Sequence, residues 1–237
     1  MTQQTKRSRM MIFTILAVIL LSAAIFYAAI FVIERPGGIA DRLLSEAVGM
    51  NDDFLKIPIG KTPEEAVEQF RGGSSSPYVI HQEPVDEGML LFKTSTRQDS
   101  ENLQVEYVRK TRLGWKWVWG GGFSNSEASD KPSAVHYMIL PELKGVSTPF
   151  PMLFGYLFDP SVVRITVETI KDGRYEAKQI EAGPDERIWF VFLPSSADMP
   201  YEIKGYDESG EQIASKIVDD PNDSGIFNLG TTALSAP

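Results

Sequence analysis

Residues 103–120 read LQVEYVRKTRLGWKWVWG, and this stretch decides the fold of the domain around it. Two strand-like runs, Leu103–Lys110 and Gly114–Gly120, are separated by only three residues. Such a short link favours an antiparallel pair, because parallel strands need a crossover of about a dozen residues or more. In the first run apolar residues alternate with Gln104 and Glu106, which is typical of a strand with one face in water.

The segments before this pair complete a small α+β domain, which we place at residues 61–123. The segment TPEE at 62–65 is typical of a helix start, since a Thr can cap free amides and a Pro suits the first helical position. Two more strand-like runs follow, at Tyr78–Glu83 and Met89–Ser95, again with short links. We therefore expect one helix packed on a four-stranded antiparallel meander.

From residue 134 onward the pattern contains strands only. The strand-like runs are Ala134–Leu140, Met152–Phe158, Val162–Ile170, Tyr175–Ala182, Arg187–Leu193, Tyr201–Asp207 and Gln212–Val218. The run Ile188–Leu193 is apolar at every position, so we expect a central strand that is covered on both faces. Seven short strands at this spacing predict an immunoglobulin-like β-sandwich at residues 134–218, although the Cys pair of antibody domains is absent.

Met10–Ile33 is a run of 24 residues without a charge. As a helix it is roughly 36 Å long, enough to cross a hydrocarbon core of ~30 Å. Three basic residues precede it, so the positive-inside rule predicts a cytoplasmic segment at 1–9 and an extracytoplasmic location for residues 34–237. We expect residues 10–33 to be a transmembrane helix that anchors a single-pass protein in the lipid bilayer of the cell membrane.

The alternative for this N-terminal segment is a cleaved signal peptide. Ser22-Ala23-Ala24 has the small-x-small form of a cleavage site. Nine more apolar residues follow it, however, and the whole run is longer than the apolar region of about 7–15 residues that is usual in signal peptides. The anchor is therefore favoured.

Three connecting segments complete the organisation. Residues 34–60 are expected to form a stalk with a short amphipathic helix, residues 124–133 a polar linker, and residues 219–237 a flexible tail rich in Asp, Asn, Ser and Gly. The apolar stripe of the stalk helix could lie on the membrane or dock on the next domain. Docking is favoured, because the polar face of that helix carries mixed charges rather than a basic cluster.

The composition excludes several classes of function. The chain has 237 residues, with 23 Lys and Arg, 32 Asp and Glu, two His and no Cys. Without Cys it has no disulfide framework, no thiolate metal site and no catalytic thiol. Beyond the first nine residues, 20 basic residues stand against 32 acidic ones, a net charge of −12, so nucleic acid is not an expected partner. We also expect no metal and no cofactor.

The sequence contains no recognisable catalytic constellation. His81 and His136 both lie within strand-like runs, and no Ser has the Gly-x-Ser-x-Gly surroundings of a hydrolase nucleophile. An envelope hydrolase could use two carboxylates at a suitable separation, but sequence spacing does not establish such a pair. We therefore assign no catalytic residue and expect a protein that is not an enzyme.

The tryptophans of the opening stretch are the candidate binding residues. Trp115, Trp117 and Trp119 are two positions apart, so in a regular strand their indoles would share one face. Such a face could stack on sugar rings or on the side chains of a peptide. The same indoles could instead fill the core between the meander and the helix, or a contact between the two domains. Core packing is favoured, and the binding platform stays open.

The order of anchor, capped helix, meander ending in LGWKWVWGGG at 113–122, and β-rich half resembles uncharacterised single-pass, membrane-anchored envelope proteins of Bacillus- and Paenibacillus-type bacteria. The helix-plus-meander half is similar, more weakly, to cystatin-like or nuclear transport factor 2-like domains. The resemblance implies a compartment and an architecture, and it transfers no catalytic residue. We expect a membrane-anchored extracytoplasmic module that binds a membrane or envelope protein. The alternatives are a cell-wall glycan-binding module and an envelope hydrolase.

Overall fold

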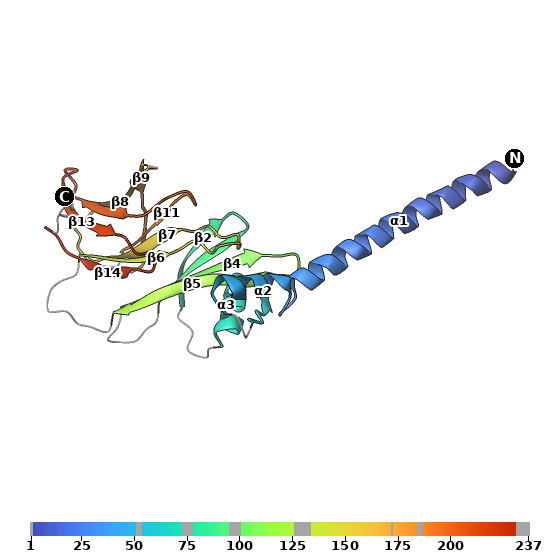
Figure 1. Ribbon diagram of the computed structural model, residues 1–237, viewed down its shortest axis with the longest axis horizontal. Helices are drawn as coiled ribbons and strands as arrows, with labels where there is room; N and C mark the ends of the chain where they lie inside the picture. The colour runs from blue at the N-terminus through green and yellow to red at the C-terminus, as the bar shows by residue number, and fades with distance from the viewer. Residues whose placement is uncertain are drawn as a thin grey trace.

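The computed structural model of the protein describes residues 2–50, 54–72, 78–94, 101–125, 134–171, 173–183 and 187–230. Within these ranges the chain forms fourteen strands and three helices, namely α1 (Thr2–Glu34), α2 (Ile39–Ala47) and α3 (Pro63–Arg71). Figure 1 shows α1 projecting away from the rest of the molecule, where the strands lie in stacked layers. The described strand pairs are antiparallel, so the predicted α+β architecture with antiparallel sheets is confirmed.

The strands form three sheets. The first sheet has the order β1-β5-β4-β3-β2, with β1 (Ile59–Gly60), β2 (Tyr78–Val85), β3 (Gly88–Thr94), β4 (Glu101–Lys110) and β5 (Trp115–Asn125). The middle sheet has the order β10-β11-β7-β6-β14, with β10 (Lys178–Glu181), β11 (Arg187–Phe192), β7 (Met152–Leu157), β6 (Val135–Leu140) and β14 (Ser224–Phe227). The last sheet has the order β13-β12-β8-β9, with β13 (Gln212–Val218), β12 (Tyr201–Tyr206), β8 (Arg164–Thr169) and β9 (Gly173–Glu176). We call these sheets, together with α2 and α3, the β-stack.

Helix α3 covers one face of the first sheet, and the expected signals set its ends. The Thr62 hydroxyl accepts a hydrogen bond from Glu65 N at 3.2 Å, and the Glu65 carboxylate accepts one from Lys61 N at 2.7 Å. This arrangement is close to a capping box, except that Glu65 binds the amide of Lys61 rather than that of the capping residue Thr62. Gly72 ends the helix in the left-handed conformation at φ +68°. The predicted helix on a meander is present, with β1 as a fifth strand that the sequence did not indicate.

The middle sheet is apolar on both faces and is covered on both. Along β11, Ile188 and Phe190 belong to the core that the middle sheet shares with the first sheet. Trp189 and Val191 alternate with them and belong to the core shared with the last sheet. The prediction of a central strand that is covered on both faces is therefore confirmed.

The first and middle sheets share one hydrophobic core. The ring centroid of Phe92 on β3 lies 4.9 Å from that of Phe190 on β11. The ring centroid of Phe123 on β5 lies 6.1 Å from that of Phe154 on β7. The two predicted domains thus pack as one continuous stack of layers rather than as modules joined only by a linker (Figure 1).

Two of the predicted connecting segments are part of the fold. The tail expected at 219–237 includes β14, which pairs with β6, so the prediction of a flexible tail is wrong for that strand; residues 231–237 lie outside the described ranges. The stalk expected at 34–60 contributes α2 and β1 to the β-stack. The linker expected at 124–133 begins within β5, and its residues 126–133 are also outside the described ranges.

The run predicted as one strand at 175–182 is divided between two sheets. Strand β9 ends at Glu176 in the last sheet, and β10 begins at Lys178 in the middle sheet. Ala177, between them, still donates its amide to Ile165 O at 3.0 Å. The chain therefore passes from one sheet to the other at this residue, which connects their edges.

The shared core predicts that the two halves of the β-stack unfold together. Phe190→Ala removes a ring that is 2% exposed, and it should lower the free energy of unfolding by about 3–5 kcal/mol. Denaturant unfolding of the full chain, followed by tryptophan fluorescence, should show one transition before and after the substitution. Ile170→Ala is the control, because this side chain is 72% exposed and should matter little. Two transitions, of which Phe190→Ala shifts only one, would contradict the shared core.

His136 of β6 is buried at the boundary between the first and middle sheets. Its ring centroid lies 5.4 Å from that of Phe123 and 4.8 Å from that of Phe158. The residue is only 3% exposed, and burial lowers its pKa to about 4. The folded protein therefore holds a neutral imidazole in its core at neutral pH.

This histidine should make the fold less stable in acid. An unfolded His has a pKa of about 6.5, so between pH ~6.5 and ~4 the unfolded chain binds a proton that the folded chain does not. Stability is lost as the pH falls through this window, by up to about 3 kcal/mol for this one group. His136→Phe removes the titration and keeps a ring between two aromatic neighbours. Urea unfolding at about pH 7.5 and 4.5 should give a smaller acid loss for the variant than for the wild type; equal losses would refute the assignment.

Candidate functional site

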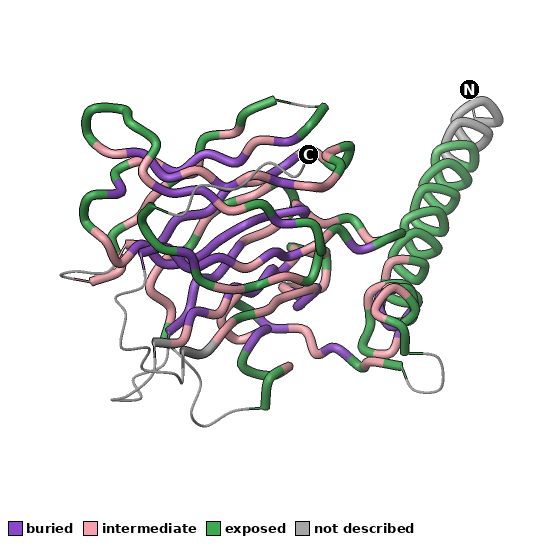
Figure 2. Tube along the Cα trace, turned by 60° about the vertical axis from the view of Figure 1, so that its left-hand side comes forward, coloured by how far each residue is buried: buried purple, intermediate pink, exposed green. Residues whose placement is uncertain are grey.

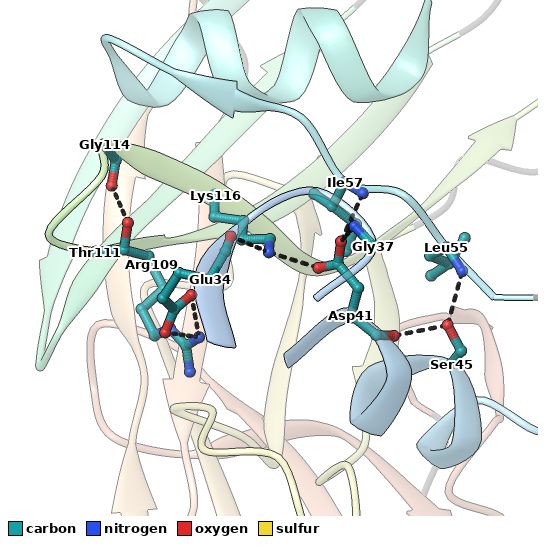
Figure 3. Close-up of polar contacts among 10 residues, drawn as sticks. All are labelled: Glu34, Gly37, Asp41, Ser45, Leu55, Ile57, Arg109, Thr111, Gly114 and Lys116. Atoms are coloured by element: carbon teal, nitrogen blue, oxygen red, sulfur yellow. Dashed lines mark hydrogen bonds and ion pairs between the residues drawn. The ribbon is translucent and has the colours of Figure 1, made fainter. Parts of the chain in front are cut away.

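The C-terminal end of α1 meets α2 and the first sheet around a small pocket. The pocket has a volume of about 180 Å³, and residues from α1, α2, β4, β5 and the loop at 145–147 line it. Charged side chains of opposite sign converge here, as Figure 3 shows. Because the apolar helix joins the β-stack at this point, the junction is the candidate functional site.

A buried ion pair forms the centre of the junction. Asp41 of α2 and Lys116 of β5 lie 2.6 Å apart, and their side chains are only 1% and 3% exposed. The second carboxylate oxygen of Asp41 accepts hydrogen bonds from Gly37 N at 2.7 Å and Ile57 N at 3.0 Å. The Lys116 ammonium also donates to the carbonyl oxygen of Glu34 at 2.7 Å. Since a buried charge is costly unless it is paired and hydrogen-bonded, these contacts are what permit the pair.

A second ion pair and a serine extend this network to the neighbouring segments. Arg109 Nη2 on β4 donates to both carboxylate oxygens of Glu34, the last residue of α1, at 3.2 and 3.3 Å. Ser45 Oγ donates to Asp41 O at 2.7 Å and accepts from Leu55 N at 2.8 Å. The end of α1, helix α2 and the first sheet are thereby held in one arrangement (Figure 3).

The turn at Pro36-Gly37-Gly38 brings these groups together. Gly37 has φ +73°, a conformation that residues with a side chain rarely adopt. A Cβ atom on Gly38 would lie 2.6 Å from the carbonyl oxygen of Ile33, so a larger residue would push the chain away from α1. These two glycines let α2 start directly beside the end of α1.

Helix α2 docks on the β-stack through one side only. Asp41, Leu44 and Ser45 are buried, whereas Ile39 and Leu43 are 48% and 50% exposed. The docking interpretation is therefore correct for the buried side of the helix. Two apolar side chains nevertheless remain at the surface, close to the end of α1.

The three candidate tryptophans do not share one face. The pairing of β4 with β5 shifts register between Tyr107 and Val108. Trp119 pairs with Tyr107, and Trp117 pairs with Val108. Because adjacent residues of β4 point to opposite faces, Trp117 lies on the face under α3 and Trp119 on the face towards the middle sheet. The prediction of a single indole face is wrong, since a β-bulge separates these two tryptophans.

Trp117 is a core residue bound to a buried carboxylate. Its ring stacks on Phe70 of α3 with centroids 3.9 Å apart, and its Nε1 donates to Glu106 at 2.6 Å. The side chain of Glu106 is 0% exposed and also accepts hydrogen bonds from Arg71, at 2.8 and 3.0 Å, and from Gln104. The polar side of β4 was expected to face water, and α3 covers it instead.

The glycines that follow the tryptophans allow close packing. A Cβ atom on Gly120 would lie 1.9 Å from the Glu106 carboxylate, and one on Gly121 would lie 3.0 Å from Leu140 of the middle sheet. The glycine run thus leaves room for a buried carboxylate on one face and for a neighbouring sheet on the other. Trp115 and Trp119 are both partly exposed, on opposite faces of the sheet.

The two buried carboxylates serve to hold elements together. Asp41 and Glu106 are each enclosed by donors of the chain itself, which leaves them no free position for a substrate. His81 lies 3.2 Å from Glu83 on β2, whereas His136 is packed in the core. Over the ranges that the structure describes, no group of three or more His, Asp or Glu is placed to bind a metal.

The buried pair predicts unequal effects of substitutions at the junction. Asp41→Ala leaves Lys116 buried without its partner and two amides without their acceptor, so it should lower the free energy of unfolding by about 3–5 kcal/mol. Arg109→Ala, the control at the more exposed pair with Glu34, should cost about 1 kcal/mol. Denaturant unfolding of both variants measures the difference. If Asp41→Ala and Arg109→Ala lowered the free energy of unfolding by the same amount, Asp41 would not be the centre of the junction.

Comparisons with known proteins assign no family to the chain. It matches no protein-family model, no curated protein and no solved structure. Its function therefore has to follow from its own residues and their arrangement.

Proposed function

We propose that the protein is a non-enzymatic, membrane-anchored module whose β-stack binds a membrane or envelope protein on the extracytoplasmic side. The observation that carries this proposal is the junction, held by buried hydrogen bonds and an ion pair, between an exposed apolar helix and a β-sheet body. A protein that only needs a tether can use a flexible linker. A junction built on a buried ion pair instead fixes how the β-stack is presented to a neighbour in the membrane.

The anchor is supported by the surface of α1. The helix is long and apolar enough to cross a membrane, and the β-stack buries none of its apolar window. Figure 2 shows exposed residues along this helix, while the buried residues gather within the sheets. A helix satisfies its own backbone groups, so lipid is the favourable surrounding for such a surface.

The proposed orientation of the chain across the membrane follows from the charges on either side of α1. Lys6, Arg7 and Arg9 precede the apolar run, and the positive-inside rule keeps such residues in the cytoplasm. The remaining chain carries a net charge of −12 and then lies outside. This arrangement agrees with the resemblance to single-pass envelope proteins of Bacillus- and Paenibacillus-type bacteria.

We further propose that the middle and last sheets form an immunoglobulin-like sandwich. If β6 is strand A, the orders β6-β7-β11-β10 and β13-β12-β8-β9 correspond to A-B-E-D facing G-F-C-C′, with β14 added beside A. Tyr201, at the start of strand F, donates its hydroxyl hydrogen to Ala197 O at 3.1 Å, as in a tyrosine corner. Antibody and many cell-surface domains use this architecture, and this analogy of fold supports the proposal without identifying the partner.

A glycan-binding platform is not favoured. The β-bulge separates the indoles, and the ring of Trp117 is occupied by Phe70. A flat row of three stacking faces therefore does not form on either side of the first sheet.

Photo-cross-linking of the full chain in intact cells tests the proposed function. Because the chain has no Cys, a cross-linker can be attached at a single introduced cysteine, for example Glu202→Cys on the last sheet or Ser224→Cys on the middle sheet. We expect mass spectrometry to identify the same membrane or envelope protein repeatedly from at least one position. A monomer without a reproducible neighbour would overturn the binding role. A soluble product shortened by about 25–30 residues would overturn the anchor.

A further inference from the structure

The turn between β4 and β5 lies against the side of α1 well before that helix ends. The guanidinium of Arg112, in this turn, lies 5.0 Å from the ring centroid of Phe26. Phe26 precedes Glu34 by eight residues, which is about 12 Å along a helix. The β-stack therefore reaches past the end of α1 towards the N-terminus of the helix.

The exposure of α1 falls about one turn beyond this contact, towards the C-terminal end of the helix. Large apolar side chains from Met10 to Tyr27 are 53–70% exposed. Phe31, Val32 and Ile33 are only 49%, 47% and 40% exposed, because α2 and the first sheet lie beside this end of the helix. The last turns of the helix are thus partly covered by protein, whereas the preceding part is free to contact lipid.

These two observations place the edge of the hydrocarbon core near Tyr27. A charged guanidinium is costly within hydrocarbon. The part of α1 that Arg112 touches must therefore lie at the level of the lipid headgroups and not within the hydrocarbon core. Met10–Tyr27 comprises 18 residues, or roughly 27 Å of helix, which is close to the ~30 Å of a hydrocarbon core. Tyrosine is also enriched at this boundary. The run at 28–33 then belongs to the headgroup layer, although its composition alone placed it in the span.

Basic side chains surround the point where α1 leaves the β-stack. Those without a carboxylate partner in the described ranges, all of them exposed, are Arg35, Arg42, Lys56, Lys110 and Arg112. Some basic residues elsewhere are paired with acids, as Lys204 and Arg174 are with Glu168. Free cations at this end contrast with the net charge of −12 on the chain beyond its first nine residues.

We propose that this end of the β-stack rests on phospholipid headgroups, with Arg112 bound to lipid phosphate. We call this surface the membrane seat and define it by Arg112, Arg42, Lys56, Ile39 and Leu43. Guanidinium groups bind phosphate through paired, charge-assisted hydrogen bonds, and the half-exposed Ile39 and Leu43 can enter the interfacial layer. The inference rests on the proposed membrane anchor, and it adds a second lipid contact that sets the height and tilt of the β-stack.

Depth-dependent quenching of a fluorophore on the full chain tests the membrane seat. A Leu113→Cys variant, labelled beside Arg112, is reconstituted in vesicles of phosphatidylcholine and phosphatidylglycerol that contain headgroup spin-labelled lipid. Because the label should lie among the headgroups, we expect quenching at least about twofold stronger than for Ser224→Cys on β14, which Figure 1 places far from α1. Equal quenching at the two positions would overturn the seat.

A charge reversal tests the role of Arg112 itself. Arg112→Glu in the Leu113→Cys background should weaken the quenching, because a carboxylate repels lipid phosphate. Lys216→Glu makes the same change of charge on β13 and should leave the quenching unaltered. Unchanged quenching of the Leu113→Cys label in the Arg112→Glu variant would show that the arginine does not bind phosphate.

A third label separates failure of the seat from failure of the anchor. Leu20→Cys lies within the proposed span, and lipid that is spin-labelled deep in its acyl chain should quench a fluorophore there. Loss of quenching at Leu20→Cys would overturn the anchor. Normal quenching at that position, together with none at Leu113→Cys, would overturn the seat alone.

Discussion

The middle sheet is apolar on both faces, and the need to cover both determines where the other layers lie. Its β11 alternates side chains between two separate cores, one shared with the first sheet and one shared with the last sheet. Trp189 lies in the second core and donates its Nε1 hydrogen to His136 O of the same sheet at 2.9 Å, so its polar atom is satisfied as well. Once the first sheet has covered one side, its own outer face requires α3. The order of layers thus follows from a single doubly buried sheet.

Charges are buried where these layers and α1 meet. Glu106 lies between α3 and the first sheet, and Asp41 lies between α2 and the same sheet. Each carboxylate is bound by several donors, an arrangement that tolerates few alternative positions of the elements. Buried ion pairs are weak evidence for stability, and here their clearer role is to specify one geometry.

The sequence alone predicted those parts of the fold that depend only on a local pattern of residues. The TPEE segment predicted the start of α3, and the continuous apolar run at 188–193 predicted a doubly covered strand. The polar pattern of β4 was read as a wet face, because alternation shows which side of a strand is polar and not what covers it. Glu106 was missed for that reason. Asp41 was missed because the charged residues of α2 were assigned to the polar face of that helix, whereas Asp41 is buried against Lys116. The bulge before Trp119 was missed because it depends on the register with β4, which the residues of β5 alone do not encode.

The tight turn at Gly37-Gly38 has a mechanical consequence. With a Cβ excluded at Gly38 and the neighbouring Asp41 fixed by Lys116, the end of α1 is clamped to the first sheet. In the proposed membrane-anchored arrangement, the β-stack acts as a lever arm whose pivot lies at the membrane surface. A sideways pull by a bound neighbour on the far end of the stack becomes a torque on α1. The same clamp would pass a change in bilayer thickness or curvature outward, as a rotation of the whole β-stack.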